Sequence, residues 1–247
     1  MRPKLALCIF GNPRKFKTSF PSIEKNILSK IDTDIFISTW DSGGSKDTVW
    51  DTDEGSTEEF RSLYSPKAME ANGYAPGDPA YDYVKIQNEE HDYWLHGTSM
   101  FFNIHNCNRL KNEYAIKNNI VYDFVLSTRS DIEFVSPLSE KQMEELAYNR
   151  NLCFARRKNH ERDFYAIEDF VALCSNESYD IYSSVFTNID KLQEGGVRVD
   201  TGSPRLHRQA TRRPQTKIIF NESILKNHLL NNKVQIKDID LTYNLLR

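Results

Sequence analysis

Two short apolar segments separated by a segment of helical period stand at the start of the chain, and they constrain its fold more than any other feature. Residues 5–10 (LALCIF) are continuously apolar and end at the turn sequence GNP. A second apolar run, DIFIS, occupies residues 34–38. Between them Pro21 suits a first helical position, and isoleucines recur on one helical face at Ile23, Ile27 and Ile31. A strand, a helix and a strand in this order form a β-α-β unit, which predicts a parallel sheet.

The rest of the chain continues the alternation of helices and strands. We expect helices at residues 100–114, 139–148, 178–189 and 222–230, and strands at 124–128, 151–155 and 234–239. No internal repeat or low-complexity linker divides the sequence. The sequence therefore predicts one α/β domain over residues 1–247, with a mixed, mainly parallel sheet flanked by helices.

The composition is that of a folded protein with no general attraction for polyanions. Of its 247 residues, 39% are hydrophobic and 27% charged, and the formal net charge is -3, so we expect no nucleic-acid partner. No run of about 18 apolar residues and no signal-peptide segment is present, so we expect no membrane span and a cytoplasmic location. The four cysteines are scattered without a CxxC pair, and we expect them to be reduced and buried.

The segment at residues 122–134 (YDFVLSTRSDIEF) carries the most informative polar group. Its apolar strand is interrupted by the run Thr128, Arg129, Ser130 and Asp131 before the apolar pattern resumes. Charged residues at the carboxyl end of a buried strand are typical of a ligand site in an α/β protein. The alternative is an Arg–Asp pair on the surface at a strand end.

Four segments together resemble a group of GT-A-like glycosyltransferases that build the surface polysaccharides of bacteria and large DNA viruses. These segments are LCIFGNPRKFKTSFPSIEKNIL, DIFISTWD, SNESYDIYSSVF and NESILKNHL, with YDFVLSTRSDIEF between the second and the third. Their order and spacing carry the resemblance, which leaves residues 41–97 and 194–215 unmatched. It implies a GT-A fold with a nucleotide-sugar half at residues 1–135 and an acceptor half at 136–247. In a virus, the protein would act in the host cytoplasm.

The resemblance implies a transferase that moves a monosaccharide from a UDP- or GDP-linked sugar to a saccharide hydroxyl with inversion. At the nucleotide it places Gly11, Arg14, Thr39, Trp40 and Asp41, the glycine for close backbone approach and the arginine for charge. Trp40 has an equally good interpretation as a core aromatic. The alternative for Arg14 is a solvated turn charge, which we favour less than the nucleotide contact. The oligomeric state stays open.

The family's two metal-binding carboxylates, the DxD motif, fall on Arg129 and Asp131. An arginine binds diphosphate oxygens but cannot ligate Mg²⁺ or Mn²⁺, so the replacement puts a divalent metal on Asp131 in doubt. Glu133 can restore a second carboxylate, since residues two apart on a strand share a face.

Two basic runs are candidates for neutralising the leaving diphosphate in place of a metal. The first contains Arg156, Arg157, Lys158 and Arg162, and the second Arg205, Arg208, Arg212 and Arg213. Of the second run, Arg208 is the candidate nucleotide contact. The alternative for both runs is a solvated face of the protein.

An inverting transfer needs a carboxylate that takes the proton of the acceptor hydroxyl. The resemblance places candidates at Asp169, with Glu168 beside it, and at Glu222, which also suits a helix N-terminus. We favour Asp169. The alternative function is a nucleotide-sugar-binding or glycan-binding protein of the same fold without catalysis. A nucleotidyltransferase is a third class, for which GNPRKFK is a partial match.

Overall fold

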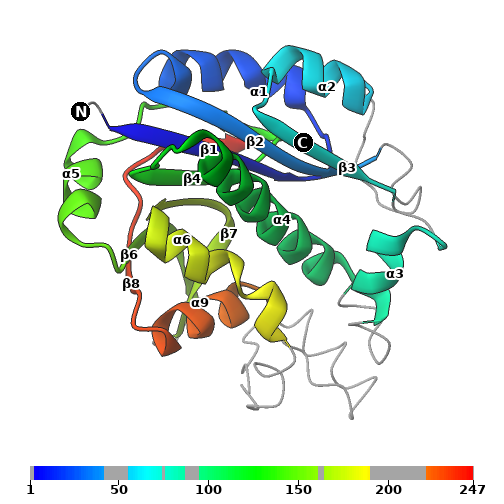
Figure 1. Ribbon diagram of the computed structural model, residues 1–247. Coiled ribbons are helices and arrows are strands. Elements are labelled where there is room, and N and C mark those ends of the chain that lie inside the picture. The colour runs from blue at the N-terminus through cyan, green and yellow to red at the C-terminus, as the bar shows by residue number, and fades with distance from the viewer. Residues whose placement is uncertain are drawn as a thin grey trace, which may run out of the picture.

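A seven-stranded sheet runs through the molecule and carries helices on both faces (Figure 1). The computed structural model describes residues 3–41, 55–73, 76–86, 95–160, 164–189 and 221–246. The sheet has the order β3-β2-β1-β4-β7-β6-β8. Its strands are β1 (Lys4–Gly11), β2 (Asp32–Trp40), β3 (Ala68–Asn72), β4 (Phe124–Arg129), β6 (Leu152–His160), β7 (Phe164–Ser175) and β8 (Gln235–Lys237). A separate antiparallel pair joins β5 (Ile132–Phe134) to β9 (Tyr243–Leu245).

The strand directions make the sheet mixed and mainly parallel. β1 pairs in parallel with β2 and β4, β2 with β3, and β6 with β8, whereas β7 is antiparallel to β4 and β6. The predicted α/β class, with a mainly parallel sheet flanked by helices in one domain, is therefore confirmed. The sheet continues from residues 1–135 into 136–247 through the β4–β7 pair.

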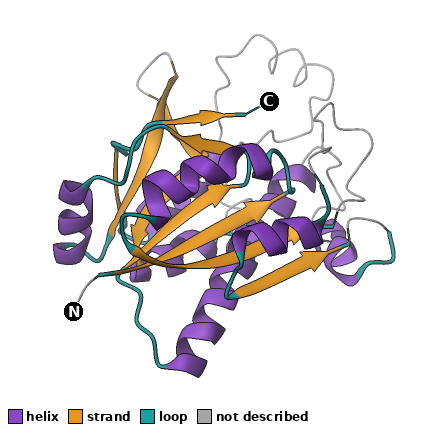
Figure 2. Cartoon of the chain, turned by 90° about the horizontal axis from the view of Figure 1, so that it is seen from above, coloured by secondary structure: helices purple, strands orange, loops and turns teal. Residues whose placement is uncertain are grey.

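Two helical layers explain why the central strands are apolar without alternation. Leu5, Leu7 and Ile9 of β1 pack on one face of the sheet, and Ala6 and Cys8 pack on the other. A strand covered on both faces needs apolar side chains in both directions. One layer contains α1 (Phe16–Ile23), α2 (Thr57–Tyr64) and α5 (Glu140–Tyr148), and the other α4 (Leu95–Asn118), α6 (Asn176–Ser183) and α9 (Asn221–Asn231), as Figure 2 also shows.

Short polar caps fix where several helices begin. Ser56 and Glu59 form a capping box at α2, in which each side chain accepts a hydrogen bond from the other residue's backbone N–H. Ser139 accepts from Gln142 N–H at the start of α5, and Ser175 accepts from Ser178 N–H at α6.

The structure corrects three of the expected elements. Pro21 lies inside α1 rather than at its first position, because the helix already begins at the buried Phe16, and a π-helical turn, η1 (Glu24–Leu28), follows. The helix expected at 178–189 is divided into α6 and the 3-10 turn η2 (Phe186–Asn188). The strand expected at 234–239 is the shorter β8.

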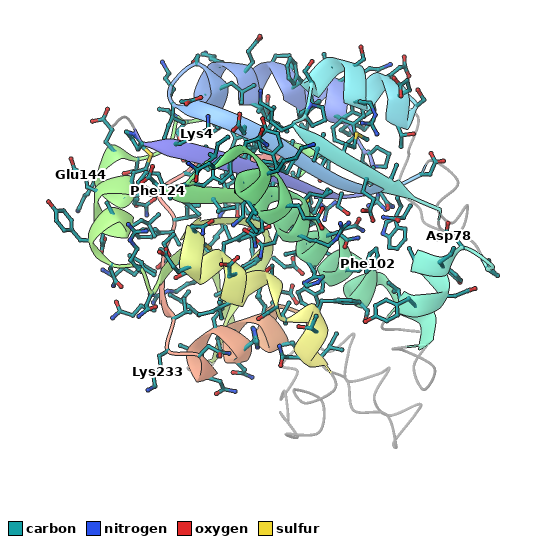
Figure 3. The ribbon with its side chains drawn as sticks, in the orientation of Figure 1. Lys4, Asp78, Phe102, Phe124, Glu144 and Lys233 are labelled. Carbon is teal, nitrogen blue, oxygen red and sulfur yellow. The ribbon has the colours of Figure 1, made fainter. Side chains whose placement is uncertain are left out.

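The carboxyl ends of the parallel strands lie along one edge of the sheet. In Figure 3, Lys4 and Phe124 mark the amino ends of β1 and β4 on one side, and Asp78 and Phe102 lie toward the other side. Asp78 directly precedes α3 (Pro79–Ile86), and Phe102 belongs to the first half of α4. Within the described ranges no helix combines the length and apolar character needed to cross a membrane.

Candidate functional site at the carboxyl ends of β1 and β4

The sheet order reverses between β1 and β4. The chain adds β2 and β3 on one side of β1 and then places β4 on the other side. Open α/β sheets bind ligands at such a reversal, beyond the carboxyl ends of the two strands. We call this place in the fold, at the carboxyl ends of β1 and β4, the crevice. In the parallel register Phe10 lies beside Arg129. The next residue of each strand end, Gly11 and Ser130, therefore follows at the same edge of the sheet.

Ser130 fastens the loop after β1 to the turn after β4. Its hydroxyl accepts a hydrogen bond from Arg14 N–H at 3.1 Å and lies 2.8 Å from the carbonyl oxygen of Asn12, to which it can donate. The Ser130 carbonyl in turn accepts from the Ser19 hydroxyl of α1 at 2.6 Å. The backbone of residues 12–14 is therefore held in place at the crevice.

Arg129 and Asp131 form a two-pronged ion pair across the same turn. The Arg129 Nε donates to Asp131 Oδ1 at 2.8 Å, and Nη2 donates to Oδ2. The Asp131 side chain is 5% exposed and that of Arg129 22%. The guanidinium carbon also lies 4.8 Å from the ring centroid of Phe170 on β7. The carboxylate and the ring together fix the guanidinium in one orientation at the edge of the sheet.

Arg14 brings a second guanidinium to this place. Burial lowers its pKa, the positive charge of Arg129 lowers it further, and the Asp131 carboxylate opposes both effects. The pKa of an arginine is so high that the side chain stays charged. The charges of Arg14, Arg129 and Asp131 thus lie close enough to influence one another, and two guanidinium groups stand at the carboxyl ends of β1 and β4. This arrangement suits an anion such as a phosphate group.

The residues present do not fit a divalent cation at this position. Both oxygens of Asp131 already accept hydrogen bonds from Arg129. Glu133, the candidate second carboxylate, accepts instead from the side-chain amide of Asn244 on β9 at 3.2 Å. The described part of the chain contains no group of three or more His, Cys, Asp or Glu side chains arranged to hold a metal.

The candidate nucleotide residues on β1 and β2 lie near the same edge in different environments. Gly11 ends β1 with a φ of 94°, and a Cβ built there would have no atom of a described residue within 4 Å, so no described residue fills the space beside its backbone. Thr39 is fully buried. Trp40 is 2% exposed and stacks on Phe102 with ring centroids 5.3 Å apart, which favours its interpretation as a core aromatic. Asp41 is exposed and accepts from the Thr57 hydroxyl at 3.1 Å.

The candidate base lies in an irregular stretch of β7. Ala155 of β6 faces Ala172, but Arg157 faces Ile167, so Arg156 alone spans the same stretch as residues 168–171. Such bulges redirect side chains and are frequent next to active sites. The stretch adjoins β4, because Val171 pairs with Thr128 at its carboxyl end. Asp169 is 4% exposed and directly precedes Phe170, the ring under Arg129.

Glu168 is held by residues from two other strands. The Tyr243 hydroxyl of β9 donates to Glu168 Oε2 at 2.7 Å, and Arg156 Nη1 lies 3.7 Å from the same oxygen. The Arg156 guanidinium covers the Tyr243 ring at 3.9 Å. Burial and the Glu168 carboxylate both raise the pKa of Tyr243, which keeps its hydroxyl protonated. Glu168, Arg156 and Tyr243 thus form one connected group.

The remaining candidates belong to other elements or lie outside the described residues. Glu222 stands in the first turn of α9, which rests on β7 through its apolar side. In the first basic run, Arg157 donates to the carbonyl oxygen of Ile236 at 2.9 Å, so it serves partly to hold β8. Arg162 and all of the second basic run, including Arg208, lie outside the described residues.

Sequence reasoning missed three residues that build the site. Ser130 lies within the segment at residues 122–134, but the sequence pattern assigns it no role. Serine hydroxyls nevertheless often form hydrogen bonds with backbone groups. Phe170 went unnoticed because β7 was not predicted as a strand. Tyr243 reaches Glu168 only through the pairing of β9 with β5, which no local pattern in the sequence indicates.

Comparison with known proteins identifies the family of the chain. Residues 1–198 match a family described as a domain of unknown function, DUF7796. The chain belongs to the DUF7796 family. The matched region contains Arg14, Arg129, Asp131 and Asp169, so the crevice lies within the DUF7796 domain, whereas β8, β9 and α9 follow it. No curated protein matches the chain.

Proposed function

We propose that this DUF7796 protein is a glycosyltransferase of the GT-A type that moves a monosaccharide from a UDP- or GDP-linked sugar to a saccharide hydroxyl in the cytoplasm. The sequence resemblance to GT-A-like enzymes is one support. The other is the crevice between β1 and β4, where charged side chains stand at the place that α/β proteins use for nucleotides.

The observation that carries the proposal is the Arg129–Asp131 pair with Arg14 beside it. A nucleotide-sugar donor leaves as a nucleoside diphosphate, whose negative charge increases in the transition state. Fixed cations stabilise that charge when they are already oriented before the reaction. Asp131 and Phe170 orient Arg129 from two sides, and this guanidinium can direct its remaining N–H groups at a diphosphate. The proposed mechanism therefore uses arginines in the role that a metal has in DxD enzymes.

The backbone at the crevice adds a second means of recognition. Ser130 holds the loop of residues 12–14, and Gly11 leaves open space where a side chain would otherwise project. A diphosphate can therefore approach the end of β1 closely while Arg14 supplies charge. We therefore propose that the phosphates lie between β1 and β4.

On the acceptor side we propose Asp169 as the general base. It removes the proton of the acceptor hydroxyl as this oxygen attacks the anomeric carbon from the face opposite the diphosphate, which inverts the configuration. Its support is position, because Asp169 directly precedes the Phe170 ring on which Arg129 rests. Glu168, in the same bulge but bound to Tyr243, is the comparison residue for mutagenesis.

The alternative is a binding protein that holds a nucleotide sugar or a glycan without transfer. The replacement of a metal-binding carboxylate by Arg129 is the feature that favours this alternative. A nucleotidyltransferase is the third class, and the loop after β1 is its only support.

Product analysis with radiolabelled UDP- and GDP-sugars and candidate saccharide acceptors separates the three classes. A transferase releases a nucleoside diphosphate, and a nucleotidyltransferase releases pyrophosphate. A binding protein releases neither product. For the proposed enzyme, we expect Asp169→Asn to abolish nucleoside diphosphate release while nucleotide affinity stays within about threefold of wild type. Full release by Asp169→Asn, with loss in Glu168→Gln, would move the base to Glu168.

A further inference from the structure

Two of the cysteines face each other across neighbouring strands in the core. Cys153 of β6 and Cys174 of β7 are register partners in the antiparallel pairing. The Cys174 thiol donates to the Cys153 sulfur, and the two Sγ atoms are 3.2 Å apart. Both residues are 0% exposed. No other position of the fold brings two sulfur atoms of described residues into a hydrogen bond.

The other two cysteines differ from this pair. Cys8 belongs to β1, and Cys107 belongs to α4, where its thiol donates to the carbonyl oxygen of Ile9 at 3.1 Å. Both are 0% exposed and belong to the same apolar cluster as Cys153 and Cys174. They therefore share the burial of the pair but not its geometry, and they serve as internal controls.

We propose that Cys153 and Cys174 are a modification site, a cross-strand dithiol that a peroxide-class oxidant converts to a disulfide. Directly opposed residues on antiparallel strands have Cα atoms about 4.5–5.5 Å apart, which falls within the range of about 4.4–6.8 Å that disulfides span. The sulfur atoms need to approach by only about 1 Å to reach the bond length of about 2.05 Å. This proposal does not depend on the proposed transferase activity.

The chemistry balances with hydrogen peroxide as the oxidant. One sulfur, as its thiolate, attacks a peroxide oxygen, which breaks the O–O bond and gives a sulfenic acid and one water. The second sulfur then attacks the sulfenic sulfur, forms the S–S bond and expels a second water. The two sulfurs together lose two electrons, the peroxide gains them, and both thiol protons end in water.

The complete burial of both thiols predicts that oxidation is slow and that the disulfide, once formed, is protected from reductants. Burial raises the pKa of the Cys174 thiol well above its usual range, and the hydrogen bond with Cys153 raises it further. The reactive thiolate is therefore scarce. Since both sulfurs are fully buried, a disulfide formed there is equally shielded from reduction.

The pair is linked to the candidate base through Tyr182 of α6. Burial raises the pKa of Tyr182, and the nearby thiols and the Asp169 carboxylate raise it further. The thiols and Asp169 are thus both near enough to Tyr182 to act on its charge. A disulfide would fix β6 to β7 next to the bulge that carries Asp169.

The test treats the full-length native protein with hydrogen peroxide and maps its peptides by mass spectrometry without reduction, after alkylating the remaining thiols. We expect a mass loss of about 2 Da from the two thiol hydrogens and a peptide that links Cys153 to Cys174. We also expect the melting temperature to rise by about 5 °C or more, and a reductant acting on the unfolded protein to reverse the link.

Cys8→Ala should keep the linked peptide, and Cys174→Ala should lose it together with the gain in melting temperature. Because the link is mapped in wild-type protein, the test does not depend on the folding of either variant. The proposal is overturned if all four thiols of the treated wild type remain open to alkylation after unfolding. It is equally overturned if the link joins Cys8 or Cys107 instead.

Discussion

Arg129 donates hydrogen bonds to both carboxylate oxygens of Asp131 across the turn that ends β4. In the proposed GT-A assignment, this pair takes the place of the two carboxylates that hold a metal. The opposite charges of Arg129 and Asp131 attract each other in the folded protein. The pair therefore holds a guanidinium in place at the crevice. The consequences for stability and for ligand binding can be measured separately.

Removing one partner should destabilise the protein. In Arg129→Ala the Asp131 carboxylate, 5% exposed, loses the charge that compensates its burial. We expect the free energy of unfolding to fall by about 2–4 kcal/mol. Urea denaturation followed by circular dichroism measures it. The control is Arg150→Ala in the surface pair of Arg150 and Glu177, which should lower the free energy of unfolding by under about 1 kcal/mol. Equal losses in the two variants would contradict a buried role for the Arg129–Asp131 pair.

Gly11→Ala should affect ligand binding more than stability. The φ of 94° strains any side chain, which costs about 1–2 kcal/mol, but the new methyl group meets no atom of the described part of the chain within 4 Å. It would project into the space proposed for the diphosphate. We expect nucleotide affinity, measured by calorimetry, to fall about tenfold or more, a loss of about 1.4 kcal/mol.

Gly77 provides a matched control for that substitution. It has the same φ of 94°, and again no atom of a residue that the structure describes lies within 4 Å of a built Cβ, but it lies just before α3. Gly77→Ala should therefore show the same strain in unfolding experiments and unchanged nucleotide affinity. A similar loss of affinity in both variants would place the nucleotide elsewhere.

Ser130→Ala tests whether the clamp between the two loops matters. The substitution removes the hydroxyl that accepts from Arg14 N–H and can donate to the Asn12 carbonyl. We expect the free energy of unfolding to fall by about 1–2 kcal/mol. We also expect a lower affinity for nucleoside diphosphates, because the loop that carries Arg14 loses its hydrogen bonds to the Ser130 hydroxyl. Ser29→Ala, at an exposed serine whose hydroxyl donates to the Lys25 carbonyl of its own helical turn, is the control. Unchanged affinity in Ser130→Ala would show that the loop is held by its other contacts.

Acid should destabilise the protein partly through His228. This side chain is 4% exposed, and burial lowers its pKa, although the hydrogen bond to the Ile181 carbonyl opposes the shift. The unfolded chain binds the proton near pH 6.5 while the folded state still excludes it. The contribution of neutral His228 is thus complete above about pH 6.5 and is lost as the pH falls toward the folded pKa. His228→Gln should show a shallower pH dependence of unfolding free energy below pH 6.5, and an unchanged slope would assign the effect to other groups.

The β-α-β unit and the Arg129–Asp131 segment were predictable from sequence because they depend on local patterns. The continuous apolar run of β1 indicated a strand covered on both faces, and the polar run after Thr128 indicated a strand end. β7 escaped prediction because its sequence AIEDFVAL mixes charged and apolar residues at an irregular bulge. Trp40 could not be assigned either, since its burial depends on Phe102, which is distant in sequence.

The central claim is that arginines rather than a metal hold the diphosphate, and calorimetric titration of UDP and GDP tests it most directly. Each titration is performed in excess EDTA and in Mn²⁺, with wild-type protein, Arg129→Ala and the surface control Arg150→Ala. We predict binding of at least one nucleotide with the same affinity in EDTA and Mn²⁺, and a loss of about tenfold or more in Arg129→Ala alone, since a charge-assisted contact contributes about 1.5–3 kcal/mol. Binding that requires Mn²⁺ and is unaffected by Arg129→Ala would contradict this account.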